Sequence, residues 1–232
     1  MAQQRRRSRR DDRSRPVPQA QSWLRLKNPY PPIAQFSDDH IEAIHQTSLT
    51  LLRDKGIKVL SAEARQLYAT AGAKVDIDTF MVRFDPDMVL ETVGQSPATF
   101  TMHGRAPQRW FEVGGDNLVF ATVGGPPHYS DLEGGRRAGT HDTFRDLLRL
   151  AQTYDVLHLT TPMVEPQDLP TNVRHLHSTR SVVTLTDKPT FIYSRGREAV
   201  ADSLKILRMA QGLDQHAFED QVHCYTVVNA NS

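Results

Sequence analysis

The chain has 232 residues, of which 38% are apolar and 24% charged, with a net charge of +1, as is typical of a soluble globular protein with enough apolar material for a core. No apolar run approaches the roughly 18 residues of a membrane span, and no signal-peptide core follows the basic start, so the sequence favours a cytoplasmic protein over a membrane or secreted one. Cys224 is the only cysteine, which excludes an internal disulfide and a cysteine-cluster metal site.

The charge is divided unevenly. Residues 1–20 hold seven arginines and two aspartates, a net charge of +5, whereas residues 21–232 hold 21 basic and 25 acidic residues, a net charge of −4. The arginine-rich run has no apolar periodicity and precedes Pro16 and Pro18, so we expect a disordered tail. It is either simply solvated or attached electrostatically to phosphates or acidic partners. The acidic remainder excludes a nucleic-acid surface spread over the whole protein.

Residues 21–115 are expected to form a small mixed α+β region. Three helices are predicted, capped by Ser37, Ser61 and Asp85; the first two stop at Gly56 and Gly72, and an apolar stripe from Ile41 to Leu52 lines the first. Strands are predicted over 75–84, around 100–102 and over 110–113.

From residue 116 onward, short apolar runs alternate with helical patterns. Strands are predicted over 118–121, 156–159, 191–193 and 222–228, and helices after Thr140, near 172–185 and over 197–211 with a stop at Gly212. Residues 131–137 are typical of a hairpin with a Glu-Gly-Gly turn, whose Arg136 and Arg137 form ion pairs or meet an acidic partner. Four strands alternating with three helices imply parallel pairing with right-handed crossovers.

A parallel sheet needs cover on both faces. If each strand directs about two apolar side chains inward, leaving them uncovered forgoes about 12–24 kcal/mol. That upper value rivals the net stability of a whole domain, roughly 5–15 kcal/mol. Either the preceding region covers this sheet or the sheet belongs to something larger, and we expect the second.

Several segments carry a family resemblance when taken together. They are Gly-Gly-Asp-Asn at 114–117, Gly-Gly-Pro-Pro at 124–127, Asp-Leu-Glu-Gly-Gly-Arg-Arg at 131–137, Gly-Thr at 139–140, Glu-Pro-Gln-Asp-Leu-Pro at 165–170, Asp-Lys-Pro at 187–189 and Asn-Ala-Asn-Ser at 229–232. In order and spacing, over about residues 33–232, they resemble the trimethylamine methyltransferase family.

The resemblance implies a (β/α)8 TIM-type barrel that moves a methyl group from a methylated amine to the cobalt of a separate corrinoid protein. By the same resemblance, the chain supplies a tail (1–20), the mixed region (21–115) and the first half of the barrel (116–232), so we expect it to be inactive on its own. No cofactor is bound directly, since the cobalamin is carried by the partner. Family members act on trimethylamine or on quaternary amines such as glycine betaine. The resemblance does not decide between a monomer and a homo-oligomer.

Barrel sites lie where strands end and loops begin. This rule selects the loop 122–128, the segment 161–165, Ser194 with Arg195, and Asn229 with Asn231. Because the amine is a cation, Glu165 could supply a carboxylate and Tyr193 an aromatic face for its ammonium. The alternatives are a solvated or helix-capping acid at Glu165 and a core tyrosine with a bonded hydroxyl.

The remaining candidates are less specific. Gly124 and Gly125 permit close approach to a ligand, or form a plain turn, and His128 is expected in the same loop as a polar contact. Asn229 completes the predicted substrate-binding set. His175 and His177, two apart on a helix, face different directions, so we expect no metal there. His158 and Cys224 are expected in strands, as a hydrogen-bonded core histidine and a small buried residue.

Two other functions remain open. The chain could be a non-catalytic partner subunit whose sheet is completed by another chain. It could also be an enzyme with an open doubly wound sheet, although the glycine fingerprint for dinucleotides is absent.

Overall fold

A computed structural model of the chain describes residues 23–228, in which short strands alternate with seven helices, so the predicted mixed α/β class is confirmed. Two compact units are present: residues 28–99, here the amino-terminal unit, and the segment 23–27 together with residues 100–228, here the main unit. The predicted tail, Asn229 and Asn231 lie outside the described residues.

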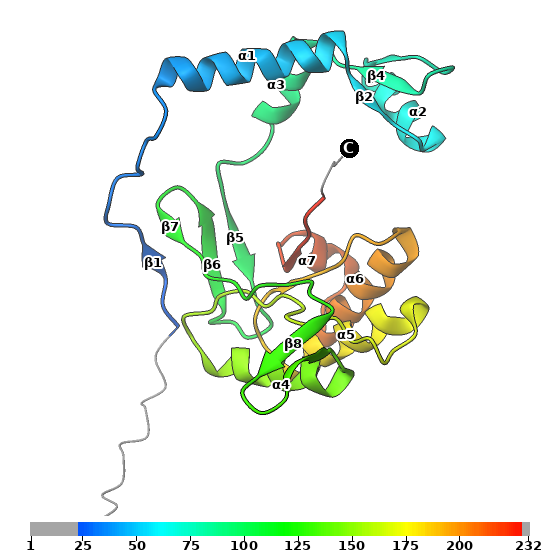
Figure 1. The fold of residues 1–232 in the computed structure, drawn as a ribbon. Helices are drawn as coiled ribbons and strands as arrows, with labels where there is room; N and C mark the ends of the chain where they lie inside the picture. The colour runs from blue at the N-terminus through cyan, green and yellow to red at the C-terminus, as the bar shows by residue number, and fades with distance from the viewer. Residues whose placement is uncertain (1–22, 229–232) are drawn as a thin grey trace, which may run out of the picture. The chain divides into compact units, whose positions relative to one another are not determined.

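The amino-terminal unit contains three helices (Figure 1), and a side-chain cap begins each of them. The helices are α1 (Asp38–Asp54), α2 (Ala62–Thr70) and α3 (Pro86–Gly94). The three predicted caps, Ser37, Ser61 and Asp85, each accept a backbone N–H from the following turn. Ile41 and Ile44 of the predicted apolar stripe are more than half exposed, whereas Leu49, which is not part of that stripe, is buried.

A three-stranded antiparallel sheet completes this unit. Its order is β2 (Ile57–Lys58), β4 (Met81–Arg83) and β3 (Lys74–Val75), with Val82 opposite both Ile57 and Val75. The stretch 75–84, predicted to be rich in strand formers, holds the end of β3 and the whole of β4, because the chain reverses between them. The Asp76 carboxylate accepts the N–H groups of Asp78 and Thr79 and closes the turn between β3 and β4.

Four parallel segments organise the main unit. Ala121 pairs with Leu159, Thr160 pairs with Thr190, and β10 (Thr190–Phe191) pairs with β11 (Cys224–Tyr225), all in parallel. These four segments therefore lie side by side in their chain order, and the Val222 segment forms a further parallel bridge to Met102. The connections contain α4 (His141–Thr153), α5 (Thr171–Leu185), α6 (Arg197–Gln211) and the short α7 (Gln215–Glu219).

The three long helices pack in sequence, α4 against α5 and α5 against α6 (Figure 1). Phe144 and Leu148 of α4 are fully buried and pack with Val164 and Val182. The predicted cap at Thr140 is confirmed, since its hydroxyl accepts the Thr143 N–H. The predicted stop at Gly212 also holds, with φ at 68°.

The predicted strands of the main unit are mostly too long. The expected strand over 156–159 pairs only at its end, at Leu159 and on to Thr160, and the one over 191–193 is β10. Within 118–121, Leu118 belongs to β7 (Asn117–Leu118), which pairs antiparallel with β1 (Leu26–Lys27). Within 222–228, β11 has two residues, and α7 before it was not predicted.

The segment before residue 116 packs against the parallel strands. The strands β5 (Thr99–His103) and β6 (Trp110–Gly114) are partners, as predicted. Met102, Phe111 and Trp23 pack in one cluster with Leu159 and Tyr225. The expectation that the preceding region leaves the sheet uncovered is therefore wrong for this part of it.

A hairpin follows the first parallel segment. It consists of β8 (His128–Asp131) and β9 (Gly135–Ala138), as predicted for residues 131–137, and Arg137 forms an ion pair with Asp131. Within residues 23–228, no helix is both long and apolar enough to cross a membrane.

Candidate functional site

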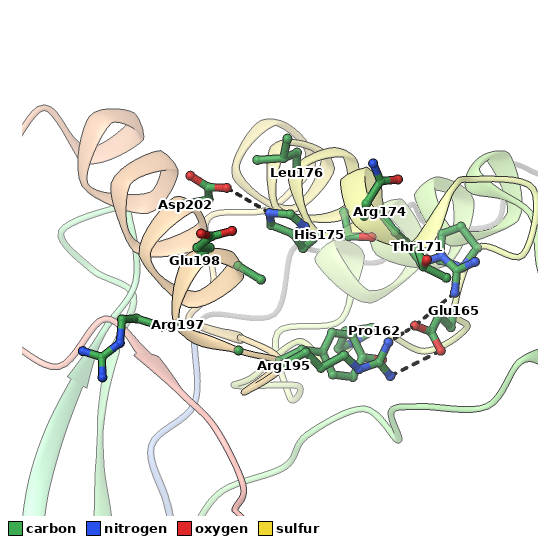
Figure 2. A pocket seen from close by; sticks show the side chains of 16 residues that line it. Pro162, Glu165, Thr171, Arg174, His175, Leu176, Arg195, Arg197, Glu198 and Asp202 are labelled. Carbon is green, nitrogen blue, oxygen red and sulfur yellow. Dashed lines mark hydrogen bonds and ion pairs between the residues drawn. The ribbon is translucent and has the colours of Figure 1, made fainter. Parts of the chain in front are cut away.

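The main unit contains a cavity of about 520 Å³ next to the segments that follow Thr160 and β10. The loop after Thr160, the start of α5, the loop after β10 and the start of α6 form its walls (Figure 2). Small-molecule sites enclose roughly 300–1,000 Å³ and, in parallel α/β proteins, lie where strands end and helices begin. This cavity is therefore the candidate site.

Glu165 is the acidic group at one side of the cavity. Its carboxylate forms an ion pair with Arg174 at 3.3 Å and a second, two-pronged one with Arg195. The side chain is only 12% exposed, so Glu165 is not a solvated loop acid. Burial alone would raise the pKa of Glu165, but the hydrogen bonds and positive charges of Arg195 and Arg174 outweigh it and lower the pKa below its ordinary value.

The two arginines that form ion pairs with Glu165 differ in their exposure to solvent and in their other hydrogen bonds. Arg174 is 14% exposed, and its guanidinium also donates to the Leu169 carbonyl at 2.8 and 3.3 Å. Arg195 is 56% exposed and extends from the loop after β10. Arg174 is thus a fixed partner of the carboxylate, whereas solvent borders Arg195.

Tyr193 presents its ring to the same arginine. The Arg195 Cζ atom lies 4.2 Å from the ring centroid, which is a cation–π geometry. The Tyr193 hydroxyl is buried, and none of the described residues hydrogen-bonds it, so the alternative of a bonded core hydroxyl is wrong. Burial, together with the negative charge of Glu165, raises the pKa of the Tyr193 hydroxyl.

Two helices begin at the cavity. Pro170 precedes α5 and Gly196 precedes α6, and neither helix has a side-chain cap hydrogen bond. Their first turns therefore direct uncapped backbone N–H groups and positive dipole ends toward this region. Glu198 and Asp202 also line the cavity, and Asp202 bonds His175 Nε2 at 3.1 Å (Figure 2).

Gly124 and Gly125 do not line this cavity; they join two loops. A Cβ atom on Gly124 would lie 2.8 Å from the Cβ of Thr161, so a larger residue cannot occupy that position unless the loops move apart. The Gly125 N–H donates to the Pro162 carbonyl at 2.9 Å, and the Glu165 N–H donates to Pro126 at 2.9 Å. The glycine turn therefore helps to position the loop that carries Glu165.

The expectation that His128 lies in this loop is wrong. His128 is the first residue of β8, where it pairs with Ala138, and its Nδ1 lies 3.2 Å from the Arg136 guanidinium. Ser194 directs its hydroxyl to the Val227 carbonyl at 3.4 Å. Asn229 falls outside the described residues, so the structure brings together only Glu165 and Tyr193 of the predicted substrate-binding set.

The sequence argument missed Arg174, His175 and Asp202 as residues of the cavity. One signal was available: Arg174 and His175 lie in the first turns of the helix that follows Glu165, on the side where barrel sites form. His175 bonds Asp202, whereas the His177 ring lies 5.7 Å from that of His141. Among residues 23–228, no group of three His, Cys, Asp or Glu side chains could hold a metal ion.

Comparisons with known proteins agree with one another. A family model described as Trimethylamine methyltransferase (MTTB) matches residues 2–232. The glycine betaine methyltransferase of Desulfitobacterium hafniense (strain Y51) is 31% identical over 178 residues, which are 76% of this chain and 37% of the relative. Trimethylamine methyltransferase MttB of the same species (strain DSM 10664 / DCB-2) is 28% identical over 179 residues, or 77% of this chain and 36% of the relative.

A third relative matches over a shorter stretch. Trimethylamine methyltransferase MttB of Methanosarcina barkeri (strain Fusaro / DSM 804) is 34% identical over 70 residues, which are 30% of this chain and 14% of the relative. The chain thus spans little more than a third of the length of the first two relatives.

Proposed function

Because the chain belongs to the trimethylamine methyltransferase family, we propose that it serves the transfer of a methyl group from a methylated amine to the cobalt of a separate corrinoid protein. The amine is trimethylamine or a quaternary amine such as glycine betaine, as in the names of the relatives. We further propose that the parallel segments 121, 159–160, 190–191 and 224–225 are the first four strands of a (β/α)8 barrel; their order in space, which follows their order in the chain, supports this.

One observation within the site carries the proposal. Glu165 and Tyr193 border the same cavity, and between them they already hold a cation, the Arg195 guanidinium. A carboxylate beside an aromatic face is the recognition chemistry of methylated ammonium groups. The geometry therefore supports an amine in this cavity.

The reaction requires a site that binds a cationic ammonium group and releases a neutral amine group. When the methyl group leaves a quaternary or protonated amine, the N–C bond breaks and its electron pair stays on nitrogen, so the amine becomes neutral. Glu165 would then lose a charge partner in a partly buried place, which is costly. Arg174, 3.3 Å away, remains as its fixed partner and limits that cost.

Equilibrium binding is the appropriate test for a chain that spans about a third of its relatives. We expect glycine betaine or trimethylammonium to bind, and 3,3-dimethylbutanoate, the uncharged-carbon counterpart of glycine betaine, to bind at least tenfold more weakly, about 1.4 kcal/mol, because it lacks the ammonium charge. Isothermal titration calorimetry measures both. Binding of none of the methylated amines, or equal binding of the carbon counterpart, would contradict the proposal.

A further inference from the structure

The position of Arg195 raises a question that the proposed function leaves open. Its guanidinium is paired with Glu165 (Figure 2) and lies over the Tyr193 ring, which is where a substrate ammonium is proposed to bind. We propose that Arg195 is an exchangeable internal cation: it fills the ammonium position between Glu165 and Tyr193 and is displaced when a methylated amine binds. This inference rests on the proposed function, because it takes the amine to bind in this cavity.

The contacts of the two arginines support exchange of Arg195 alone. Arg174 is nearly buried and is fixed by the Leu169 carbonyl as well as by Glu165. Arg195 is more than half exposed, and Glu165 is its hydrogen-bonding and ion-pair partner. A long, flexible side chain that borders solvent can leave its partners and be hydrated at once, whereas a buried guanidinium cannot.

Charge accounting also favours exchange. With Arg195 in place, the Glu165 carboxylate is paired with two cations, of which Arg174 is fixed and Arg195 can exchange. A methylated ammonium that replaces Arg195 leaves the charge around Glu165 unchanged and gains the same ring face. The site therefore avoids an uncompensated carboxylate both before the amine binds and after the neutral product leaves.

Competition of this kind has a measurable cost in affinity. If Arg195 occupies the position about 90% of the time, the apparent dissociation constant for an ammonium ligand is raised about tenfold over that of the vacant position. Removal of the Arg195 side chain should therefore tighten the binding of an ammonium ligand, although a contact is lost.

The competing interpretation is that Arg195 binds an anionic group, such as the carboxylate of a zwitterionic amine. Guanidinium groups bind carboxylates through paired hydrogen bonds, so this interpretation is chemically sound. It predicts the opposite sign for a carboxylate-bearing ligand, because loss of Arg195 would then weaken binding. It also predicts no tightening for a ligand that has no carboxylate.

Tetramethylammonium, a permanent cation without a carboxylate, is the probe that separates the two interpretations. Its dissociation constant is measured by calorimetry for the wild-type chain, Arg195→Gln and Arg195→Ala, with circular dichroism to confirm that each variant is folded. Arg180→Gln is the matched control, because Arg180 is an exposed arginine of α5 that does not line the cavity, and its replacement removes one positive charge from the same unit.

We expect both Arg195 variants to bind tetramethylammonium about five- to tenfold more tightly than wild type, and Arg180→Gln to change the affinity less than twofold. Equal tightening in Arg180→Gln would show a general charge effect and overturn the inference. Unchanged or weaker binding in the Arg195 variants, with wild type still binding methylated amines, would overturn it and leave the proposed function standing. Binding of no ammonium ligand by any variant would overturn both.

Discussion

At the scale of single residues, Glu165 connects the loop geometry to the chemistry. Its backbone N–H is fixed to Pro126, and its carboxylate lies between a buried arginine and an exposed one. The lowered pKa of Glu165 means that the carboxylate keeps its charge well into the acidic range. Any cation bound there meets a permanent negative partner at neutral pH.

Replacement of Glu165 by Gln should weaken binding of tetramethylammonium at least tenfold, since the nearly isosteric amide keeps the shape and removes the charge. Glu198→Gln is the matched control, because Glu198 lines the same cavity on α6. Because the pKa of Glu165 lies below its ordinary value, the Glu165 carboxylate stays ionised from pH 7 to pH 5 and itself contributes no change in affinity over that range. An equal loss in both variants would contradict a specific role for Glu165.

His158 belongs to the same scale but concerns stability. It is fully buried, Nδ1 accepts the Phe120 N–H at 3.1 Å, and Nε2 lies 2.6 Å from the Leu24 carbonyl, which assigns the neutral form with the proton on Nε2. Burial lowers the pKa of His158, and the Lys188 charge acts in the same direction, against the effect of Leu24. Protonation would place two N–H groups against each other at Phe120.

The unfolded chain binds a proton at His158 more readily than the folded chain does. The contribution of neutral His158 to the free energy of unfolding is therefore fully present above the ordinary histidine pKa, about 6.5, and is lost as the pH falls through the lower pKa of His158 in the folded chain. His158→Gln should lower the free energy of unfolding by about 1–3 kcal/mol at pH 7.5, because the Phe120 N–H loses its acceptor. Urea unfolding should show a smaller loss between pH 7.5 and 5.5 in the variant than in wild type, and parallel pH curves would refute this assignment.

At the scale of elements, local signals fixed the helices more firmly than the strands. A cap, an apolar spacing and a stop glycine are all contained in one segment, and α6 has the predicted bounds, Arg197–Gln211. The parallel strands instead require partners 30 or more residues away; the chain from 156 to 158 looks strand-like but pairs only from Leu159. Similarly, the stretch from Val75 to Phe84 is rich in strand formers, but the turn at Asp76 divides it between β3 and β4.

The cap of α4 is testable in isolation from the site. Thr140→Ala should lower the free energy of unfolding by about 1 kcal/mol, because the Thr143 N–H loses its acceptor at the helix start. Thr140→Ser keeps the hydroxyl and should retain most of that stability. Chemical denaturation of both variants measures the difference, and equal losses in Ala and Ser would mean that the cap hydrogen bond does not stabilise the helix.

At the scale of the whole molecule, the arrangement of parallel segments brings residues from separate loops to one cavity. The rule that sites form at strand ends selected Glu165 and Arg195 from the sequence, and the need for an aromatic face beside a cationic amine added Tyr193. It also selected Gly124, Gly125 and His128, which the structure uses in loop packing and in a hairpin instead. The pairing of Arg174 with Glu165 could not be predicted, because it depends on how the first turn of α5 folds back toward the loop before it.

The most direct test of the central claim, that a methylated ammonium binds between Glu165 and Tyr193, is an intermolecular nuclear Overhauser measurement. The chain carries protonated tyrosine rings in an otherwise deuterated background and is titrated with tetramethylammonium. The account predicts contacts from the ligand methyl protons to the Tyr193 ring that disappear in Tyr193→Leu. Contacts to other tyrosines alone, with the Tyr193 signals unchanged at saturation, would contradict it.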